Sequence, residues 1–179
     1  MYNDISKEVY SWVKTIAFAI FAALIITNVV IVNAEVPSGS MENTIQTKDR
    51  LIAFRLAYMF EKPERFDIIV FRYPENETDL YVKRIIGLPG EKVEIRDGKV
   101  YINDSNKPLI DTFTKEESGG NHGPYIVPEE KYFVLGDNRN DSRDSRYWEN
   151  RFVARDKILG KAIFRYFPNV SSFKNYKSE

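Results

Sequence analysis

The N-terminal part of the chain carries one long apolar run. Between Trp12 and Val32 the only charged residue is Lys14, and every residue from 16 to 26 is apolar. Twenty-one residues of helix span roughly 30 Å, which is the thickness of the hydrocarbon core of a bilayer. The run also lacks the polar face of a helix that packs on a soluble core. It therefore predicts a transmembrane anchor over residues 12–33.

The charges that flank this run indicate its orientation. Lys7 and Lys14 lie at its N-terminal side, whereas the next cation beyond it is Lys48. Lysine and arginine are enriched on the cytoplasmic side of membrane spans. We therefore expect a cytoplasmic N-terminus over residues 1–11 and a single pass through the cell membrane. Residues 34–179 would then form an extracytoplasmic domain.

A cleavable secretory signal is the competing interpretation of the same run. Residues 32–34, Val-Asn-Ala, have small or modest side chains at the positions that such cleavage uses. However, the apolar stretch is longer than a usual signal core, and Asp4 and Glu8 precede it. These features favour a retained anchor.

Beyond the anchor, short apolar or alternating segments are separated by turn residues. Asp97-Gly98 lies between two alternating runs and predicts a hairpin, because glycine readily adopts a positive φ. Residues 103–130 are predicted to be a long polar loop, and no amphipathic helix of convincing length follows the anchor. The expected fold is mainly β, with a transmembrane helix followed by a mostly antiparallel β domain. The predicted strands are 51–54, 67–71, 80–86, 93–95, 100–102, 132–135 and 158–167.

Residues 54–60 are rich in aromatic side chains and follow soon after the anchor. They fit a surface that dips into the bilayer beside the helix, as an exposed apolar patch would. They fit ordinary packing inside the β domain equally well. The pattern alone leaves both interpretations open.

Composition excludes several classes of function. Lys+Arg and Asp+Glu both number 26, so no net charge attracts the chain to nucleic acid. The chain has no cysteine, which excludes disulfides and thiolate metal sites. Its one histidine, His122, lies in a loop-like segment and has no second histidine or cysteine with which to share a metal. We therefore expect no metal, no cofactor and no nucleic-acid partner for one domain plus an anchor.

The predicted strand 80–86 places two cations among large apolar residues. Alternation puts Lys83 on one face of the strand and Arg84 on the other. Arginine stays protonated and needs a carboxylate partner, whereas a buried lysine can lose its proton. An exposed lysine is neutral at pH 7.4 about one time in a thousand, a handicap of roughly 4 kcal/mol that burial can remove. The alternative is a lysine that snorkels or forms an ion pair at a strand edge.

A serine-containing turn, Pro37-Ser38-Gly39-Ser40, follows the anchor. A serine attacks a peptide bond only if a base takes its proton, and the usual base is histidine. In a chain with one histidine and no cysteine, a neutral Lys83 is the remaining obvious base for Ser40. The two residues together indicate a serine–lysine hydrolase, although such a turn is also common loop chemistry.

A third segment completes a recognisable pattern. Residues 136–146 read Gly-Asp-Asn-Arg-Asn-Asp-Ser-Arg-Asp-Ser-Arg, after Pro-Ser-Gly-Ser-Met at 37–41 and Lys-Arg-Ile-Ile-Gly-Leu-Pro-Gly-Glu at 83–91. In this order the three segments closely resemble those of bacterial type I signal peptidases (leader peptidases, peptidase family S26). The compact layout with one anchor resembles the Gram-positive branch. Larger members of the family carry an added β domain, for which this chain has no room at full size.

The resemblance implies roles for four residues of the site. Ser40 matches the nucleophile and Lys83 the general base. Ser38 matches the residue whose hydroxyl forms the oxyanion hole together with the Ser40 backbone amide. Ser142 matches a serine that hydrogen-bonds to the lysine amine and orients it.

The resemblance also implies structural pairs and a substrate pocket. Arg84 with Asp137, and Asp144 with Arg146, match ion pairs of the family. Shallow apolar pockets for the first and third residues before the cut would favour small side chains, because bulky ones clash. These pockets would be lined by Met41, Val36 and Val82.

The implied activity is that of a membrane-bound serine endopeptidase. It would remove N-terminal signal peptides from exported preproteins, cutting after small residues through an acyl-enzyme. Its partners would be these preproteins, bound as extended strands, and the lipid bilayer. The chain's own residues 32–34 fit the same cleavage rule, so slow self-cleavage is a hypothesis.

Two other functions compete with this interpretation. One is a membrane-anchored, non-catalytic β module that binds exported peptides; the joint presence of the four serine and lysine site residues disfavours it. The other is a self-cleaving repressor-type protease that also uses serine and lysine. That class is cytosolic, and the N-terminal hydrophobic segment argues against it.

Overall fold

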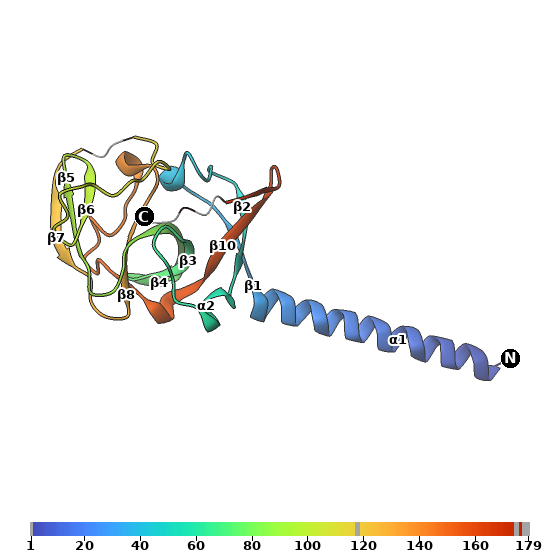
Figure 1. Ribbon diagram of the computed structural model, residues 1–179. Helices are drawn as coiled ribbons and strands as arrows, with labels where there is room; N and C mark the ends of the chain where they lie inside the picture. Colours follow the sequence, from blue (N-terminus) through green and yellow to red (C-terminus); the bar gives the residue numbers. More distant parts are fainter. Residues whose placement is uncertain (1, 117–118, 174–175, 177–179) are drawn as a thin grey trace.

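A single long helix projects from a β domain (Figure 1). The structure is a computed structural model that describes residues 2–116, 119–173 and 176. Helix α1 (Tyr2–Ile25) continues as a π-helical turn, η1 (Ile26–Val30), and strand β1 (Ile31–Glu35) follows directly. The apolar stretch Ile5–Val30 is long enough to cross a membrane, and none of it is buried against the rest of the chain.

The helical segment ends three residues before the end of the predicted anchor, 12–33. Residues 31–33 lie in β1, where Ile31 pairs with Phe54 and Asn33 with Ile52. The apolar pattern does not mark this change, because β1 alternates buried and exposed side chains while remaining largely apolar. The chain therefore passes from helix to sheet without a connecting loop.

The larger sheet is antiparallel throughout. In the described residues its strands lie in the order β1-β2-β10-β3-β4-β8-β9, with β11 paired to β10. The fold class expected from the sequence, mainly antiparallel β behind one N-terminal helix, is confirmed. Besides β1, the strands are β2 (Arg50–Phe54), β3 (Ile68–Tyr73), β4 (Asn76–Gly87), β8 (Lys131–Leu135), β9 (Val153–Ala154), β10 (Ile158–Phe167) and β11 (Ser171–Ser172).

The smaller sheet has the order β6-β5-β7, and the predicted hairpin joins two of its strands. Strands β5 (Lys92–Arg96) and β6 (Lys99–Ile102) are connected by Asp97 and Gly98, with φ values of 48° and 80°. Both residues thus have the positive φ that a two-residue hairpin turn requires. This prediction is confirmed.

The third strand of this sheet, β7 (His122–Ile126), corrects two expectations. Residues 103–130 are not one long loop, and His122 lies in a strand, because β7 pairs with β5 from Lys92↔Ile126 to Ile95↔His122. Gly123-Pro124 is typical of a turn and concealed the strand. Proline is nevertheless compatible with an edge strand, and β7 forms one edge of this sheet in the described residues.

All seven strands predicted beyond the anchor are present, and β4 is longer than expected. It begins at Asn76 because this residue, although residues 76–79 are polar and exposed, still pairs with Tyr73 of β3 across a register shift. The helical elements beyond η1 are short, as expected from the absence of amphipathic patterning. In the described residues they are η2 (Gly39–Met41), α2 (Ala57–Phe60), η3 (Arg139–Asp141) and η4 (Arg155–Lys157).

The aromatic-rich segment 54–60 has both of the environments considered for it. Tyr58 is buried and its hydroxyl donates a hydrogen bond to Asp67 at 2.9 Å. Met59 and Phe60, by contrast, are 63% and 88% exposed. The segment therefore contributes one side chain to the core and presents two apolar side chains to its surroundings.

Two consecutive cations are buried in the middle of β4. Lys83 is 4% exposed and Arg84 is 1% exposed. The Arg84 guanidinium binds the Asp137 carboxylate at 2.6 and 2.8 Å, donates to the Phe66 carbonyl, and lies 4.0 Å from the centre of the Phe113 ring. This ion pair joins β4 to the chain that follows β8.

We expect Asp137→Ala to lower the free energy of unfolding by about 3–5 kcal/mol, because it leaves the Arg84 charge buried without its partner. Denaturant titration of the full-length chain in detergent, followed by tryptophan fluorescence, measures this change. The matched control is Asp104→Asn, which removes a negative charge from the exposed pair with Lys92, tolerates the φ of 58° at this position, and should cost far less. Equal effects of the two substitutions would contradict the structural role of the buried pair.

Candidate active site

Ser40 lies in the short helical turn η2, five residues after Glu35, the last residue of β1 that pairs with β2. Ser40 is buried. The fully buried side chains of Met41 and Ile45 pack in the hydrophobic core and hold the turn in place. The sequence around Ser40 forms a turn because Pro37 and Gly39 interrupt the strand pattern. The hydroxyl is thus presented from a packed element.

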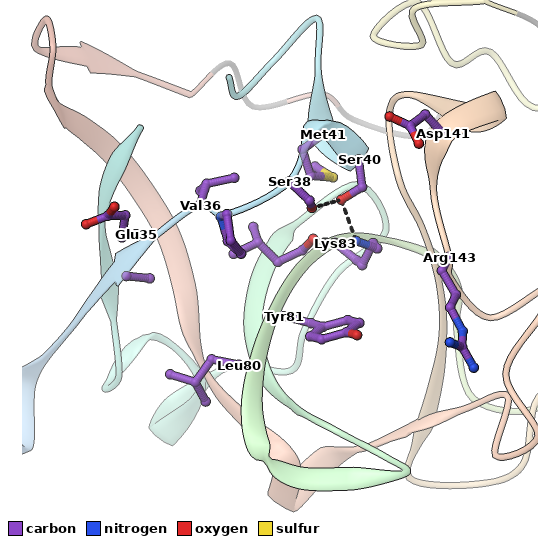
Figure 2. Close-up of a pocket in the computed structure, with 13 residues that line it drawn as sticks. Glu35, Val36, Ser38, Ser40, Met41, Leu80, Tyr81, Lys83, Asp141 and Arg143 are labelled. Carbon is purple, nitrogen blue, oxygen red and sulfur yellow. Dashed lines mark hydrogen bonds between the residues drawn. The ribbon is translucent and has the colours of Figure 1, made fainter. Parts of the chain in front are cut away.

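Lys83 reaches Ser40 from strand β4 (Figure 2). Its Nζ lies 2.6 Å from Ser40 Oγ in a hydrogen bond and 3.2 Å from the Val82 carbonyl oxygen. The structure therefore brings together the two residues on which the expected chemistry depends, although 43 positions separate them in the sequence.

The surroundings of Lys83 favour its neutral form. Burial lowers the pKa of the Lys83 amine to about 8, and the charges of Asp144 and Asp137 oppose this shift without cancelling it. An amine with this pKa is neutral about one time in five at pH 7.4, compared with one in a thousand for an exposed lysine. Lys83 can accordingly accept a proton at physiological pH.

Ser38 lies beside Ser40 at the more exposed start of the turn. Its hydroxyl donates a hydrogen bond to Ser40 Oγ at 3.3 Å. A carbonyl bound next to Ser40 would therefore lie within reach of a second hydroxyl donor, which is the arrangement that an oxyanion hole needs.

The structure does not show the hydrogen bond expected between Ser142 and the Lys83 amine. Ser142 Oγ is buried and has no hydrogen-bond partner in the described part of the chain. Ser142 is nevertheless part of the site, because a methyl group added to Gly136 would collide with Ser142 Oγ and with the Ser40 carbonyl oxygen. Close packing around Gly136 positions the hydroxyl without pairing it.

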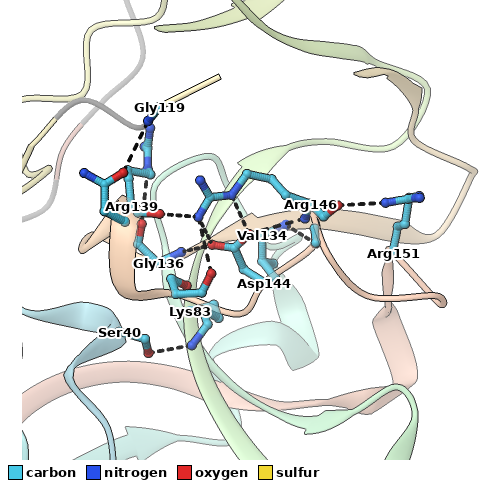
Figure 3. A network of polar contacts seen from close by, with 12 residues as sticks. Ser40, Lys83, Gly119, Val134, Gly136, Arg139, Asp144, Arg146 and Arg151 are labelled. Carbon is cyan, nitrogen blue, oxygen red and sulfur yellow. Dashed lines mark hydrogen bonds and ion pairs between the residues drawn. The ribbon is translucent and has the colours of Figure 1, made fainter. Parts of the chain in front are cut away.

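Asp144 and Arg146 form an ion pair in the wall behind Lys83 (Figure 3). Arg146 Nε lies 2.8 Å from Asp144, and the same arginine donates to the Arg139 carbonyl at 2.6 Å. Asp144 also accepts the backbone N–H of Gly136 at 3.0 Å. Both side chains are buried, so this pair fixes the course of residues 136–146 next to the lysine.

A cavity of about 320 Å³ opens next to Ser40. The three residues expected to contact substrate, Val36, Met41 and Val82, all line it, together with Ser38, Ser40 and Lys83. Figure 2 shows Val36 on one side of Ser40 and Asp141 and Arg143 on the other, so the cavity extends past the nucleophile in both directions. It also has lining residues that the sequence interpretation did not include: Ala34, Glu35, Pro37, Leu80, Tyr81, Asp141 and Arg143.

His122 lies elsewhere. Its ring packs edge-on against Tyr147 at 5.4 Å, and burial lowers its pKa. It is absent from the lining of the cavity beside Ser40. Among the residues that the structure describes, no group of three histidine, cysteine, aspartate or glutamate side chains is arranged to hold a metal ion.

Tyr81 and Asn138 have contacts with Lys83 or with the Ser40 turn that the sequence did not predict. Tyr81 lies with its ring centre 5.4 Å from Lys83 Nζ, and strand alternation had already placed both side chains on one face. Asn138, 3% exposed, donates from its side-chain amide to the Gly39 carbonyl and from its backbone N–H to the Ser40 carbonyl, both at 3.1 Å. No local pattern indicates contacts across about 100 residues.

Comparison with known proteins assigns the family. The family described as "Signal peptidase, peptidase S26" matches residues 9–167. "Probable signal peptidase I-2" of Synechocystis sp. is 42% identical over 160 residues, which cover 87% of this chain and 72% of that protein. "Signal peptidase IB" of Staphylococcus aureus (strain COL) is 31% identical over 185 residues, which cover 94% of each chain.

A crystal structure of a signal peptidase I from Enterococcus faecalis V583 is 39% identical and covers 56% of this chain and 97% of that chain, with a TM-score of 0.48. The family match itself spans most of the chain and includes Ser40, Lys83 and residues 136–146. The chain therefore belongs to the signal peptidase family, peptidase S26, a family of serine endopeptidases.

Proposed function

We propose that this chain is a membrane-anchored signal peptidase I that removes signal peptides from exported preproteins, with Ser40 as nucleophile and Lys83 as general base. The observation that carries the proposal is the 2.6 Å contact between Ser40 Oγ and the buried Nζ of Lys83. A second support is the family, whose relatives are named signal peptidases.

The reaction would proceed through an acyl-enzyme. Ser40 Oγ attacks the carbonyl carbon of the scissile bond while Lys83 Nζ accepts the hydroxyl proton. The resulting oxyanion receives hydrogen bonds from the Ser40 amide and the Ser38 hydroxyl. Lys83 then gives its proton to the leaving amine, and it activates the water molecule that hydrolyses the ester.

The cavity beside Ser40 supports selection of small side chains. Val36, Met41 and Val82 give it an apolar wall, which suits small uncharged side chains. An extended substrate segment would lie between the chain around Val36 and strand β4, with alternate side chains entering the wall.

Self-cleavage after Ala34 would require a rearrangement of the sheet. Ala34 is buried, lines the cavity and pairs with Leu51 in the ladder between β1 and β2. A protease needs an extended, accessible segment in its cleft. A molecule that cleaves itself would first have to detach β1, so we expect self-cleavage to be slow or to occur between molecules.

The proposed location is the cell membrane, with the N-terminus in the cytoplasm and the β domain on the other side. The segment carrying Met59 and Phe60 supports this arrangement, because it starts at the exit of the helix. The Arg55 backbone N–H donates to the Val30 carbonyl at 2.8 Å, and the Arg55 guanidinium donates to the Ile31 carbonyl at 3.1 Å. Two exposed apolar side chains would thus lie close to the bilayer surface.

The two competing functions fit these observations less well. A module that only binds peptides has no need of a buried lysine in contact with a serine hydroxyl. A cytosolic repressor-type protease has no need of an unburied apolar stretch from Ile5 to Val30.

We expect Ser40→Ala and Lys83→Ala each to abolish cleavage of a preprotein, because one removes the nucleophile and the other the base. His122→Ala should leave cleavage near normal, since this histidine does not line the cavity. Gel analysis of preprotein processing by the full-length variants in detergent measures all three. An active Lys83→Ala variant together with an inactive His122→Ala variant would overturn the mechanism.

The rate should depend on pH through the lysine. The active form of Lys83 is the neutral amine, so kcat/KM should rise with pH and reach half its maximum near pH 8. Well below this pH it should fall about tenfold per pH unit. A pH–rate profile of the wild type and of His122→Ala checks this, and a midpoint near 6.5 that disappears in the histidine variant would contradict it.

Replacing the exposed apolar pair beside the helix should weaken membrane contact without changing the dyad. We expect Met59→Ser with Phe60→Ser to reduce cleavage of a membrane-inserted preprotein several-fold, while cleavage of a short soluble peptide is unchanged. Proteoliposome and detergent assays of the same variant provide the comparison. A matched control is Ile126→Ser, which changes an exposed apolar residue of β7 in the smaller sheet.

A further inference from the structure

Asn138 connects the turn that carries Ser40 to the loop that follows strand β8. Its side-chain Nδ2 donates to the Gly39 carbonyl oxygen at 3.1 Å, and its backbone N–H donates to the Ser40 carbonyl oxygen at 3.1 Å. Asn138 is buried, so water does not compete well for these bonds. Asn138 alone thus binds the carbonyl groups of two successive residues, Gly39 and Ser40.

The bond to Gly39 determines the direction of the Ser40 amide. The Gly39 carbonyl and the Ser40 N–H belong to the same peptide unit, which is planar and trans, so the two groups point in opposite directions. A donor that fixes the carbonyl oxygen therefore also fixes where the N–H points. In the proposed reaction this N–H is one of the two oxyanion donors, and its direction matters because such donors must be preorganised.

The position needs this restraint because of its sequence. Gly39 has no Cβ, and its backbone has more freedom to rotate than that of any other residue. Within the turn, the Gly39 carbonyl also accepts the Glu42 N–H at 3.0 Å, which alone is a local bond in a single helical turn. The amide of Asn138 adds a second donor from a distant part of the chain.

Asn138 is itself firmly placed. The preceding residue, Asp137, is bound by Arg84 and also accepts a hydrogen bond from Thr44 Oγ at 2.5 Å. The N–H of Asp141 donates to the Asn138 carbonyl at 3.2 Å. Asn138, which contacts the Ser40 turn, is therefore held in place by the buried ion pair between its neighbour Asp137 and Arg84.

We propose that Asn138 is a positioning residue for the oxyanion hole, which acts by holding the Gly39–Ser40 peptide so that the Ser40 N–H points at the developing oxyanion. This inference rests on the proposed function. It assigns Asn138 no contact with substrate and no part in proton transfer, which distinguishes its effects from those of Ser40 and Lys83.

The test compares Asn138→Ala and Asn138→Leu with the wild type, as full-length chains in detergent. Leucine has the same branched arrangement of four side-chain heavy atoms as asparagine but cannot donate to the Gly39 carbonyl, and both variants retain the backbone bond to Ser40. We expect kcat for a preprotein to fall about tenfold to a hundredfold. This fall is no larger than the one expected when an entire oxyanion donor is removed. KM should change by less than about twofold, because substrate contacts are intact.

Two further readouts separate this role from a general structural one. The midpoint of the pH–rate profile should stay near that of the wild type, because the contact between Ser40 and Lys83 is unchanged. Inhibition by a peptide aldehyde, which forms an oxyanion on Ser40, should weaken by about the same factor as kcat/KM falls. Thermal unfolding reports the folded fraction of each variant.

Asn43→Gly is the matched control. The Asn43 side-chain amide also donates to a distant carbonyl, that of Phe113, at 2.9 Å, but not to the Ser40 peptide. Glycine tolerates the φ of 89° at this position, so the substitution removes the hydrogen bond without strain. We expect its kcat and aldehyde inhibition to stay within about twofold of the wild type.

Several results would overturn the inference. These are a kcat within twofold of the wild type in both Asn138 variants, an equal loss in Asn43→Gly, or a shifted pH midpoint, which would mean that Asn138 acts through the base. If thermal unfolding showed Asn138→Ala to be unfolded, the leucine variant would decide. A wild type that does not cleave preproteins, or one matched in rate by Lys83→Ala, would instead refute the proposed function.

Discussion

Strand β4 buries two cations at consecutive positions, and the site depends on how each is accommodated. Burial of a charge is costly unless the group is paired or becomes neutral. Arg84 cannot become neutral, and it is paired with Asp137 on one face of the strand. Lys83 faces the other side, where its contacts are Ser40 Oγ, the Val82 carbonyl and the Tyr81 ring. No carboxylate touches its amine among these contacts, so burial lowers the pKa of Lys83 to about 8. The same strand thus has one residue whose charge is stabilised by an ion pair and one whose charge is disfavoured by burial.

Residues 136–146 contact Arg84 and also lie next to Lys83 and Ser40. Asp137 pairs with Arg84, Asn138 holds the carbonyl groups around Ser40, and Asp144 pairs with Arg146 behind the lysine. Gly136 allows the loop to approach Ser40 so closely that a single methyl group would not fit. This loop is charged and polar in sequence, yet most of it is buried. Many of its polar groups find partners, either on the Ser40 turn, as Asn138 does, or on other segments, as Asp137 does with Arg84 and Arg139 with Asp111. Ser142 Oγ has no hydrogen-bond partner in the described residues.

Local patterning was sufficient to predict the helix, the main strands and the hairpin at Asp97-Gly98. Each of these depends on the residues of one segment: apolar length, alternation, or glycine in a turn. The strand pattern drew attention to Lys83 as a cation among apolar residues but did not by itself identify a base; that expected role came from the resemblance of three segments to signal peptidases. Strand β7 was missed because its Gly123-Pro124 imitates a turn and only its pairing with β5 reveals it. The contacts of Asn138 and the unpaired hydroxyl of Ser142 likewise depend on distances between segments about 100 residues apart, on which composition and periodicity carry no information.

The direct passage from helix to sheet limits how far the nucleophile can lie from the membrane. Ser40 is only the tenth residue after Val30, the last helical residue, and five of the nine residues between them belong to β1. A fully extended chain covers at most about 3.6 Å per residue, so Ser40 lies within roughly 36 Å of the helix end. For an enzyme anchored by this helix, the length of this connection sets the largest possible distance between the end of the helix and Ser40. Peptide bonds of a membrane-bound substrate would therefore be within reach only when they lie within that distance of the helix end, whereas a freely diffusing peptide would not be restricted in this way.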